Sequence, residues 1–111
     1  MPSTEKPLQK MILQYLELNR IFHYRNNSGA FKTADGHFYR FGANGSPDII
    51  AVINGLYVGI ECKDKYAKQS PSQKGFQTRL EAAGGKYACV REFGEAQAFI
   101  ESVAKGNLLL A

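Results

Sequence analysis

The stretch GSPDIIAVINGLYVGIECK, residues 45–63, decides the fold of this 111-residue chain. Two apolar runs are joined there by Asn54-Gly55, which is the strongest short-range sequence signal for a β-hairpin. Because a two-residue turn sets the register of both strands, counting outward from it places Asp48 opposite Glu61. Directly paired residues point to one face of a sheet, with Cβ atoms roughly 4.5–5.5 Å apart. The sequence therefore predicts two adjacent carboxylates at the open end of the hairpin.

Lys63 lies on the same face, two residues beyond Glu61. Like charges that face each other destabilise a sheet unless a cation lies between them. Two carboxylates form a hard-oxygen site suited to Mg²⁺ or Mn²⁺, and such an ion activates bound water and stabilises charge on a phosphoryl group. With Lys63 to orient the water or neutralise the transition state, the cluster predicts phosphodiester hydrolysis. The alternative is a surface Glu–Lys pair and a turn aspartate after Pro47.

The two faces of the hairpin differ in polarity. One face is apolar near the turn and charged at the open end. We expect both faces to be largely covered, as in a sheet flanked by helices. The other face is apolar throughout and must contact a packed layer; it carries Ile49, Ala51, Ile53, Leu56, Val58, Ile60 and Cys62.

Helices are predicted on both sides of the hairpin in the sequence. Apolar residues at helical spacing predict one over residues 4–18. Glu5, on the extension of its apolar stripe, either favours the helix dipole or leans over the sheet. Ser70 as N-cap, with Gln73 in a capping box, predicts a second helix, in which Gln73 could also reach toward the carboxylates. Its predicted buried stripe is Phe76, Leu80 and Ala83.

Further strands are predicted over residues 21–25, 37–41 and 86–91, and a last helix over 95–104. The expected order is α, β, β, β, β, α, β, α. A helix that crosses from the second hairpin strand to the strand at 86–91 makes these two strands parallel. The predicted fold class is therefore a mixed-sheet α/β domain.

Composition limits the function classes. Hydrophobic content of 44% and charged content of 22% are typical of a soluble globular protein, here one domain over residues 1–111. No apolar run reaches the ~20 residues of a membrane helix, and no signal-peptide pattern is present, so we expect a cytoplasmic protein without a membrane partner. Cys62 and Cys89 fit a reducing compartment. The net charge of +4 permits nucleic acid as a partner but does not require it.

Basic and aromatic residues interleave between residues 21 and 41, around turns predicted at 26–29 and 33–36. Basic groups bind phosphates, and aromatic rings stack on unpaired bases. The alternative is an edge hairpin with a solvated basic face. The predicted nucleic-acid contacts are Arg25, Asn27, Ser28, Lys32 and Arg40.

Gly-Ser-Pro-Asp48, twelve residues, Glu61-Cys62-Lys63 and then Gln73 on the next helix resembles the PD-(D/E)XK nuclease superfamily. Within it the sequence is most similar to the VRR-NUC family, which contains small virus-type replication-repair nucleases. The resemblance covers most of the chain. It implies a restriction-endonuclease-like αβββαβ core, with a mixed central sheet flanked by helices, in a protein of phage or bacterial type.

The resemblance also implies a role for each matching position. The metal ligands would be the two carboxylates, the backbone carbonyl of Cys62 and, through water, Glu5. Lys63 would be the catalytic lysine, and Gln73 would support the site from its helix. The implied catalytic residues are Asp48, Glu61, Lys63, Gln73 and Glu5.

Stand-alone family members resemble Holliday-junction resolvases, which are symmetric dimers that cut opposed strands. We therefore expect a Mg²⁺- or Mn²⁺-dependent, structure-selective DNA endonuclease that acts on four-way junctions as a homodimer. The dimer surface would be the aromatic residues 31–41 or the apolar residues 108–110. The alternatives are a less selective DNA nuclease, a non-catalytic DNA-binding module that keeps the fold, and a structural protein whose charged rim is a subunit interface.

Overall fold

The hairpin at the centre of the sequence forms as predicted. The computed structural model describes residues 3–26 and 29–110, without the side chains of residues 29–30, 40–41 and 107–110. Strands β4 (Ile49–Ile53) and β5 (Leu56–Cys62) pair antiparallel in the expected register, from Ile53 opposite Leu56 to Ile49 opposite Ile60. Asn54 and Gly55 both have positive φ, at 53° and 80°, which is the turn geometry that Asn-Gly favours.

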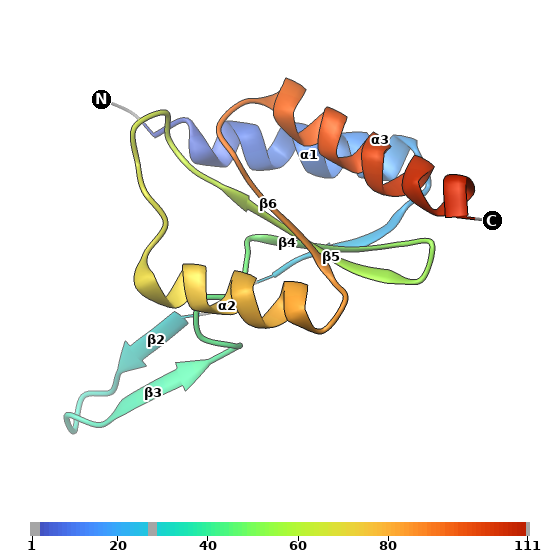
Figure 1. The fold of residues 1–111 in the computed structure, drawn as a ribbon. Coiled ribbons are helices and arrows are strands. Elements are labelled where there is room, and N and C mark those ends of the chain that lie inside the picture. Colours follow the sequence, from blue (N-terminus) through green and yellow to red (C-terminus); the bar gives the residue numbers. More distant parts are fainter. Residues whose placement is uncertain (1–2, 27–28, 111) are drawn as a thin grey trace.

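A four-stranded sheet is built around this hairpin in the order β1-β4-β5-β6 (Figure 1). β1 (Phe22–Arg25) pairs antiparallel with β4. β6 (Lys86–Val90) pairs parallel with β5, as the sequence predicted from the helix between them. The sheet is therefore mixed, and both of its central strands come from the hairpin.

Helices α1 (Glu5–Leu18) and α3 (Phe93–Leu110) lie side by side on one face of the sheet (Figure 1). They bury the apolar face of the hairpin, in agreement with the sequence. The core on this side is formed by Leu8, Ile12, Leu16, Ile49, Ala51, Ile53, Val58, Ile60, Cys62, Val90, Ala96, Ile100 and Val103.

The other face of the sheet is less covered than predicted. Helix α2 (Pro71–Ala82) contains no fully buried residue, and Ala83, expected in its buried stripe, is exposed. Val52 and Tyr57 on the open part of this face remain 40% and 38% exposed. Near the charged end, a loop replaces the helix as cover, because Pro47 packs directly against Gly59. The sheet is therefore flanked by helices as predicted, but on this face the cover stops short of Val52 and Tyr57.

A second hairpin, β2 (Gly29–Lys32) and β3 (Phe38–Phe41), forms its own two-stranded sheet and projects from the rest of the chain (Figure 1). The sequence predicted β3 but placed Gly29 in a turn and missed β2. Gly and Ala have low strand propensity, so the first half of β2 carries no local signal. The predicted αβββαβ order is recovered when this hairpin is treated as an insertion between β1 and β4.

Helix α3 is longer than the predicted 95–104 at both ends. Its start is displaced because the Glu95 carboxylate accepts hydrogen bonds from the backbone N–H groups of Arg91 (2.7 Å) and Glu92 (3.3 Å), which satisfies free donors before the first turn. None of the described helices combines the length and apolar character that crossing a bilayer requires.

Candidate active site

Asp48 lies one residue before β4, where the ladder with β5 stops one pair short of Glu61. Its carboxylate accepts a hydrogen bond from the backbone N–H of Cys62 at 2.8 Å. Its backbone carbonyl accepts from Asn26 N at 2.8 Å, and the Asn26 amide donates to the Pro47 carbonyl at 2.9 Å. The predicted cross-strand neighbourhood is therefore kept, with the Asp48 side chain in the place of a ladder hydrogen bond.

Glu61 is the charged residue at the centre of the cluster, and only 4% of its surface is exposed. Burial raises the pKa of its carboxyl to about 9, and a hydrogen bond to Asp48 and the charge of Asp48 act in the same direction. Its Oε2 atom has no hydrogen-bond partner among the described residues. A buried carboxylate in this position requires either a proton or a bound cation.

Lys63 follows β5 directly and is half-buried. Its backbone N–H donates to the Val90 carbonyl at 2.9 Å. Within the described ranges its ammonium makes no hydrogen bond or ion pair, but its charge lowers the pKa of Glu61 against the other effects. Between these two residues, Cys62 turns its side chain into the core, where burial raises the pKa of the thiol. Cys62 therefore contributes only backbone groups to the site.

Glu5 is the first residue of α1. It approaches the Glu61 end of the sheet from the face that α1 covers. Its Oε2 accepts from the backbone N–H of Asp64 at 3.3 Å, and its charge raises the pKa of Glu61. The Asp64 carboxylate in turn accepts from the backbone N–H and the hydroxyl of Thr4, each at 2.7 Å. These hydrogen bonds hold the pKa of Asp64 below its usual value. Asp64, which directly follows Lys63, thus attaches the start of α1 to the end of β5.

Asp64 was not identified from the sequence. The available signal was weak: an acid immediately after the Glu-x-Lys motif. The contact joins residues sixty positions apart, so no local pattern indicates it.

Gln73 forms the capping box of α2. Its amide oxygen accepts from Ser70 N at 2.8 Å, and its backbone N–H donates to the Ser70 hydroxyl at 3.2 Å. Of the two predicted uses of this side chain, the structure contains the cap. The polar groups that approach the carboxylates from this face are instead Tyr87 and Gln69, whose amide donates to the Tyr87 hydroxyl at 3.1 Å. Burial raises the pKa of Tyr87, and the charge of Glu61 adds to it.

Of the predicted nucleic-acid contacts, the two that are described lie apart. Arg25 ends β1 at the same end of the sheet as the carboxylates but on the opposite face, whereas Lys32 is exposed on the projecting hairpin. Asn27 and Ser28 lie outside the described residues, and so does the side chain of Arg40. Arg25 is therefore the predicted contact that can be placed at the same end of the sheet as the candidate site.

The donor set suits a small hard cation. Two carboxylates and the adjacent backbone carbonyl of Cys62 offer oxygen ligands of the kind that Mg²⁺ and Mn²⁺ prefer, with water to complete the shell. The orphaned oxygen of Glu61 is the atom that such an ion would satisfy. In the described part of the chain, no three His, Cys, Asp or Glu side chains form a ready metal group. The contact of Glu5 with the ion through water stays a prediction.

Comparison with known proteins bears on the fold. A solved structure described as a VRR_NUC domain superposes with a TM-score of 0.65 and 20% sequence identity, over 90% of this chain and 97% of that chain. No protein-family profile and no curated protein matches the sequence. The predicted fold is thus confirmed: a mixed α/β sheet flanked by helices, arranged as in a VRR_NUC domain.

Proposed function

We propose that this protein is a metal-dependent DNA endonuclease that hydrolyses phosphodiester bonds. The observation that carries the proposal is the buried Glu61 held against Asp48, with one carboxylate oxygen left unpaired among the described residues. This arrangement is unfavourable in itself. A bound Mg²⁺ or Mn²⁺ would offset this cost, with Asp48 and Glu61 as the residues that would hold it.

Asp48 and Glu61 would hold the ion, and each side chain is prepared for this differently. Asp48 is oriented by the N–H of Cys62, which leaves its second oxygen for the ion. Glu61 has a proton to lose, because its pKa is about 9 in the metal-free protein. When bound, the ion supplies an activated water and stabilises negative charge on the phosphoryl group.

Lys63 would act on the substrate side of the carboxylates. Its ammonium makes no hydrogen bond or ion pair with the described residues, so it is available to hydrogen-bond the attacking water or a phosphate oxygen. Glu5 would position the site rather than act on substrate, because it is fixed to the Asp64 backbone.

We further propose four-way DNA junctions as the preferred substrate and a homodimer as the active form. The resemblance to junction resolvases supports both. The exposed apolar patch on the open sheet face, formed by Phe22, Tyr24, Val52 and Tyr57, supports the dimer. Contiguous apolar surface of this kind is typical of an interface. The alternative hypothesis for the same site is a less selective DNA nuclease.

The test is a cleavage assay with labelled four-way junction, flap and linear duplex of shared sequence, in Mg²⁺, Mn²⁺ or EDTA. We expect metal-dependent cleavage of the junction, and loss of that cleavage in Asp48→Ala and Lys63→Ala. Cleavage that persists in Asp48→Ala would exclude the proposed site. Equal cutting of junction and duplex would leave a nuclease without structure selectivity. Binding of DNA without Mn²⁺ binding by calorimetry would favour the non-catalytic binding module.

A further inference from the structure

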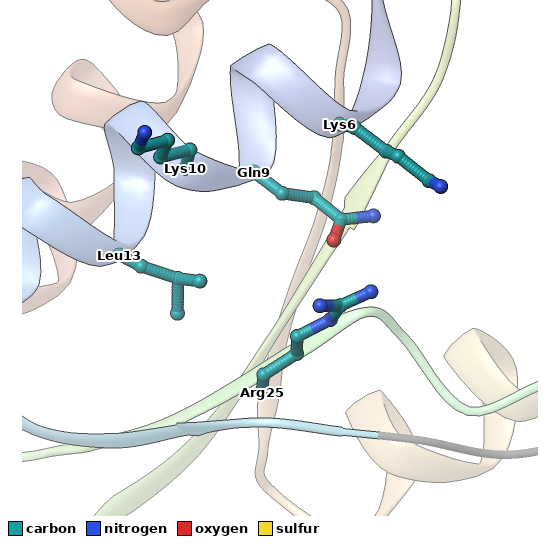
Figure 2. A pocket seen from close by; sticks show the side chains of 5 residues that line it. All are labelled: Lys6, Gln9, Lys10, Leu13 and Arg25. Carbon is teal, nitrogen blue, oxygen red and sulfur yellow. The ribbon is translucent and has the colours of Figure 1, made fainter.

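A basic pocket of about 310 Å³ lies between α1 and β1, away from the carboxylates (Figure 2). Figure 2 shows the Gln9 amide and the Arg25 guanidinium pointing toward one another, with Lys6 beside them. No carboxylate lines the pocket, and its cationic groups make no hydrogen bond or ion pair with the described residues. The full lining is Lys6, Gln9, Lys10, Leu13 and Arg25.

A positive charge in this pocket lies where it destabilises helix α1. Lys6 is the second residue of the helix, where a positive charge opposes the helix dipole. Lys10, four residues later, also lines the pocket, but its ammonium points away from Lys6 and Arg25 (Figure 2). Arg25 adds a second charge on the Lys6 side, from a different element. Two cations beside the Gln9 amide, without a counter-charge among the described residues, are explained by an anionic ligand.

The pocket and the carboxylates share one end of the sheet. Lys6 directly follows Glu5, and Arg25 directly precedes Asn26, whose backbone N–H donates to the Asp48 carbonyl. Arg25 is paired with Ile49, a core residue, so its side chain lies on the α1 face. The acidic pair occupies the opposite face of the same end. A polymer that passes this end of the sheet can contact both sites at once.

We propose that the basic pocket binds a phosphate of the DNA backbone that flanks the phosphate to be cleaved. The inference rests on the proposed function, because the bound strand is the substrate of the carboxylate site. Arg25 presents a planar fork that matches two phosphate oxygens, while Lys6 supplies a further charge and Gln9 supplies an amide donor. Lys10 adds positive charge at the edge of the pocket. The pocket thereby holds the DNA strand at a second point and determines which phosphodiester bond lies next to Lys63.

The first test measures DNA binding in EDTA by fluorescence anisotropy across a range of salt concentrations. The variants are Lys6→Ala/Lys10→Ala and Arg25→Ala, and the control is Lys105→Glu, an exposed charge on α3 outside the pocket. Loss of one phosphate contact should weaken binding about tenfold near 0.1 M salt and reduce the slope of log K against log salt by about 1. The control should keep the wild-type slope.

The second test uses inorganic phosphate as a probe of the pocket itself. Titration followed by NMR should shift the Arg25 Nε–H resonance and the amides around Lys6 and Gln9, and the shifts should be absent in Arg25→Ala. Each variant is first checked for a wild-type circular dichroism spectrum. Folding should be retained because Lys6, Lys10 and Arg25 are exposed.

The outcomes separate this inference from the proposed function. If both pocket variants cleave DNA and bind it with the wild-type salt slope, the proposed phosphate contact is wrong and the proposed nuclease function still holds. Metal-independent DNA binding that is lost in the pocket variants, without any cleavage by the wild type, would support the pocket and overturn the nuclease. Absence of DNA binding by the wild-type protein would overturn both.

Discussion

The two hairpins of this protein are held together in opposite ways. β4–β5 is buried, and Ile49, Val58 and Ile60 have no exposed surface. β2–β3 pairs only with itself, and its Phe31, Phe38 and Tyr39 are 53%, 66% and 50% exposed. In the first hairpin the Asn54-Gly55 turn sets the register and the core fixes it; in the second the local turn acts alone, through the contact of the Thr33 hydroxyl with Asp35.

This difference explains where the acidic cluster is found. The pKa of Glu61 is raised to about 9 mainly by burial, so it stays raised only where the surrounding residues do not unfold locally. The buried hairpin provides such surroundings. A two-stranded hairpin alone is marginally stable in water. The projecting hairpin is therefore suited to become ordered when it binds a partner. The buried hairpin is suited to hold side chains in a fixed position.

The largest expected effect is on cleavage. Glu61→Gln keeps the size of the side chain but removes the charge that would bind the ion, so the cleavage rate should fall by about 10³-fold or more. Asp35→Asn at the tip of the other hairpin is the matched acid-to-amide control. It should cleave within about twofold of the wild type, as measured on labelled junctions in Mg²⁺. Comparable losses in both variants would remove the functional distinction between the hairpins.

A smaller effect is expected on stability. Ile60→Ala should lower the free energy of unfolding by about 3 kcal/mol, since the side chain is fully buried. Tyr39→Ala, which removes a half-exposed ring stacked on Phe31 at 5.6 Å, should cost less than about 1 kcal/mol. Urea denaturation of the metal-free protein measures both values. A larger loss for Tyr39→Ala would mean that the projecting hairpin belongs to the main cooperative unit.

The hairpins should also differ in pH dependence. The pKa of Glu61 is raised from 4.5 to about 9 in the folded state, so its proton stabilises the fold fully below pH 4.5. That stability is lost as pH rises toward about 9, at up to about 1.4 kcal/mol per pH unit, because the folded state binds the extra proton. The pKa of Asp35 is lowered, mainly by the Thr33 hydrogen bond, so its contribution is lost instead as pH falls through its folded pKa.

This pH prediction is checked by thermal unfolding in EDTA between pH 5 and pH 9. Glu61→Gln should flatten the decline of the wild type, and Mg²⁺ should stabilise the wild type more at pH 8 than at pH 6. A wild-type protein that gains stability from pH 5 to pH 9 in EDTA would contradict the raised pKa.

The smallest effect comes from a matched pair of turn glycines. Gly55 and Gly36 have φ of 80° and 89°, and neither has a heavy atom that would touch an added Cβ. Alanine at either site therefore adds only backbone strain, about 1 kcal/mol. Gly55→Ala should lower the global free energy of unfolding by that amount. Gly36→Ala should leave it unchanged and increase hydrogen exchange only in β2 and β3; a global loss there would contradict independent opening.

The elements with a buried, periodic pattern were predictable from the sequence. The hairpin register and the neighbourhood of Asp48 and Glu61 follow from the turn, the capping box from Ser70 and Gln73, and the parallel β6 from the helix that connects it to β5. These signals are local, or they follow by counting from a fixed turn.

The features that were missed depend on contacts between distant parts of the chain. Asp64 and Thr4 meet only in the fold, and so do Gln69 and Tyr87. The pocket was missed because Lys6 and Lys10 look like an ordinary solvent-facing side of a helix until β1 places Arg25 against them. Strand β2 begins with Gly29 and Ala30, which have low strand propensity, so its sequence gave no local signal.

The attachment of α1 at Asp64 has a consequence for synthesis of the chain. A ribosome releases Glu5 and Asp48 early, but Asp64 must follow before α1 can be fixed at the site. The residue after β5, Lys63, is held only when Val90 has been made, because its N–H donates to that carbonyl. The cluster proposed to be catalytic is therefore complete only after β6 has been made. If the proposed function holds, a growing or truncated chain that lacks β6 should carry both carboxylates without cutting DNA.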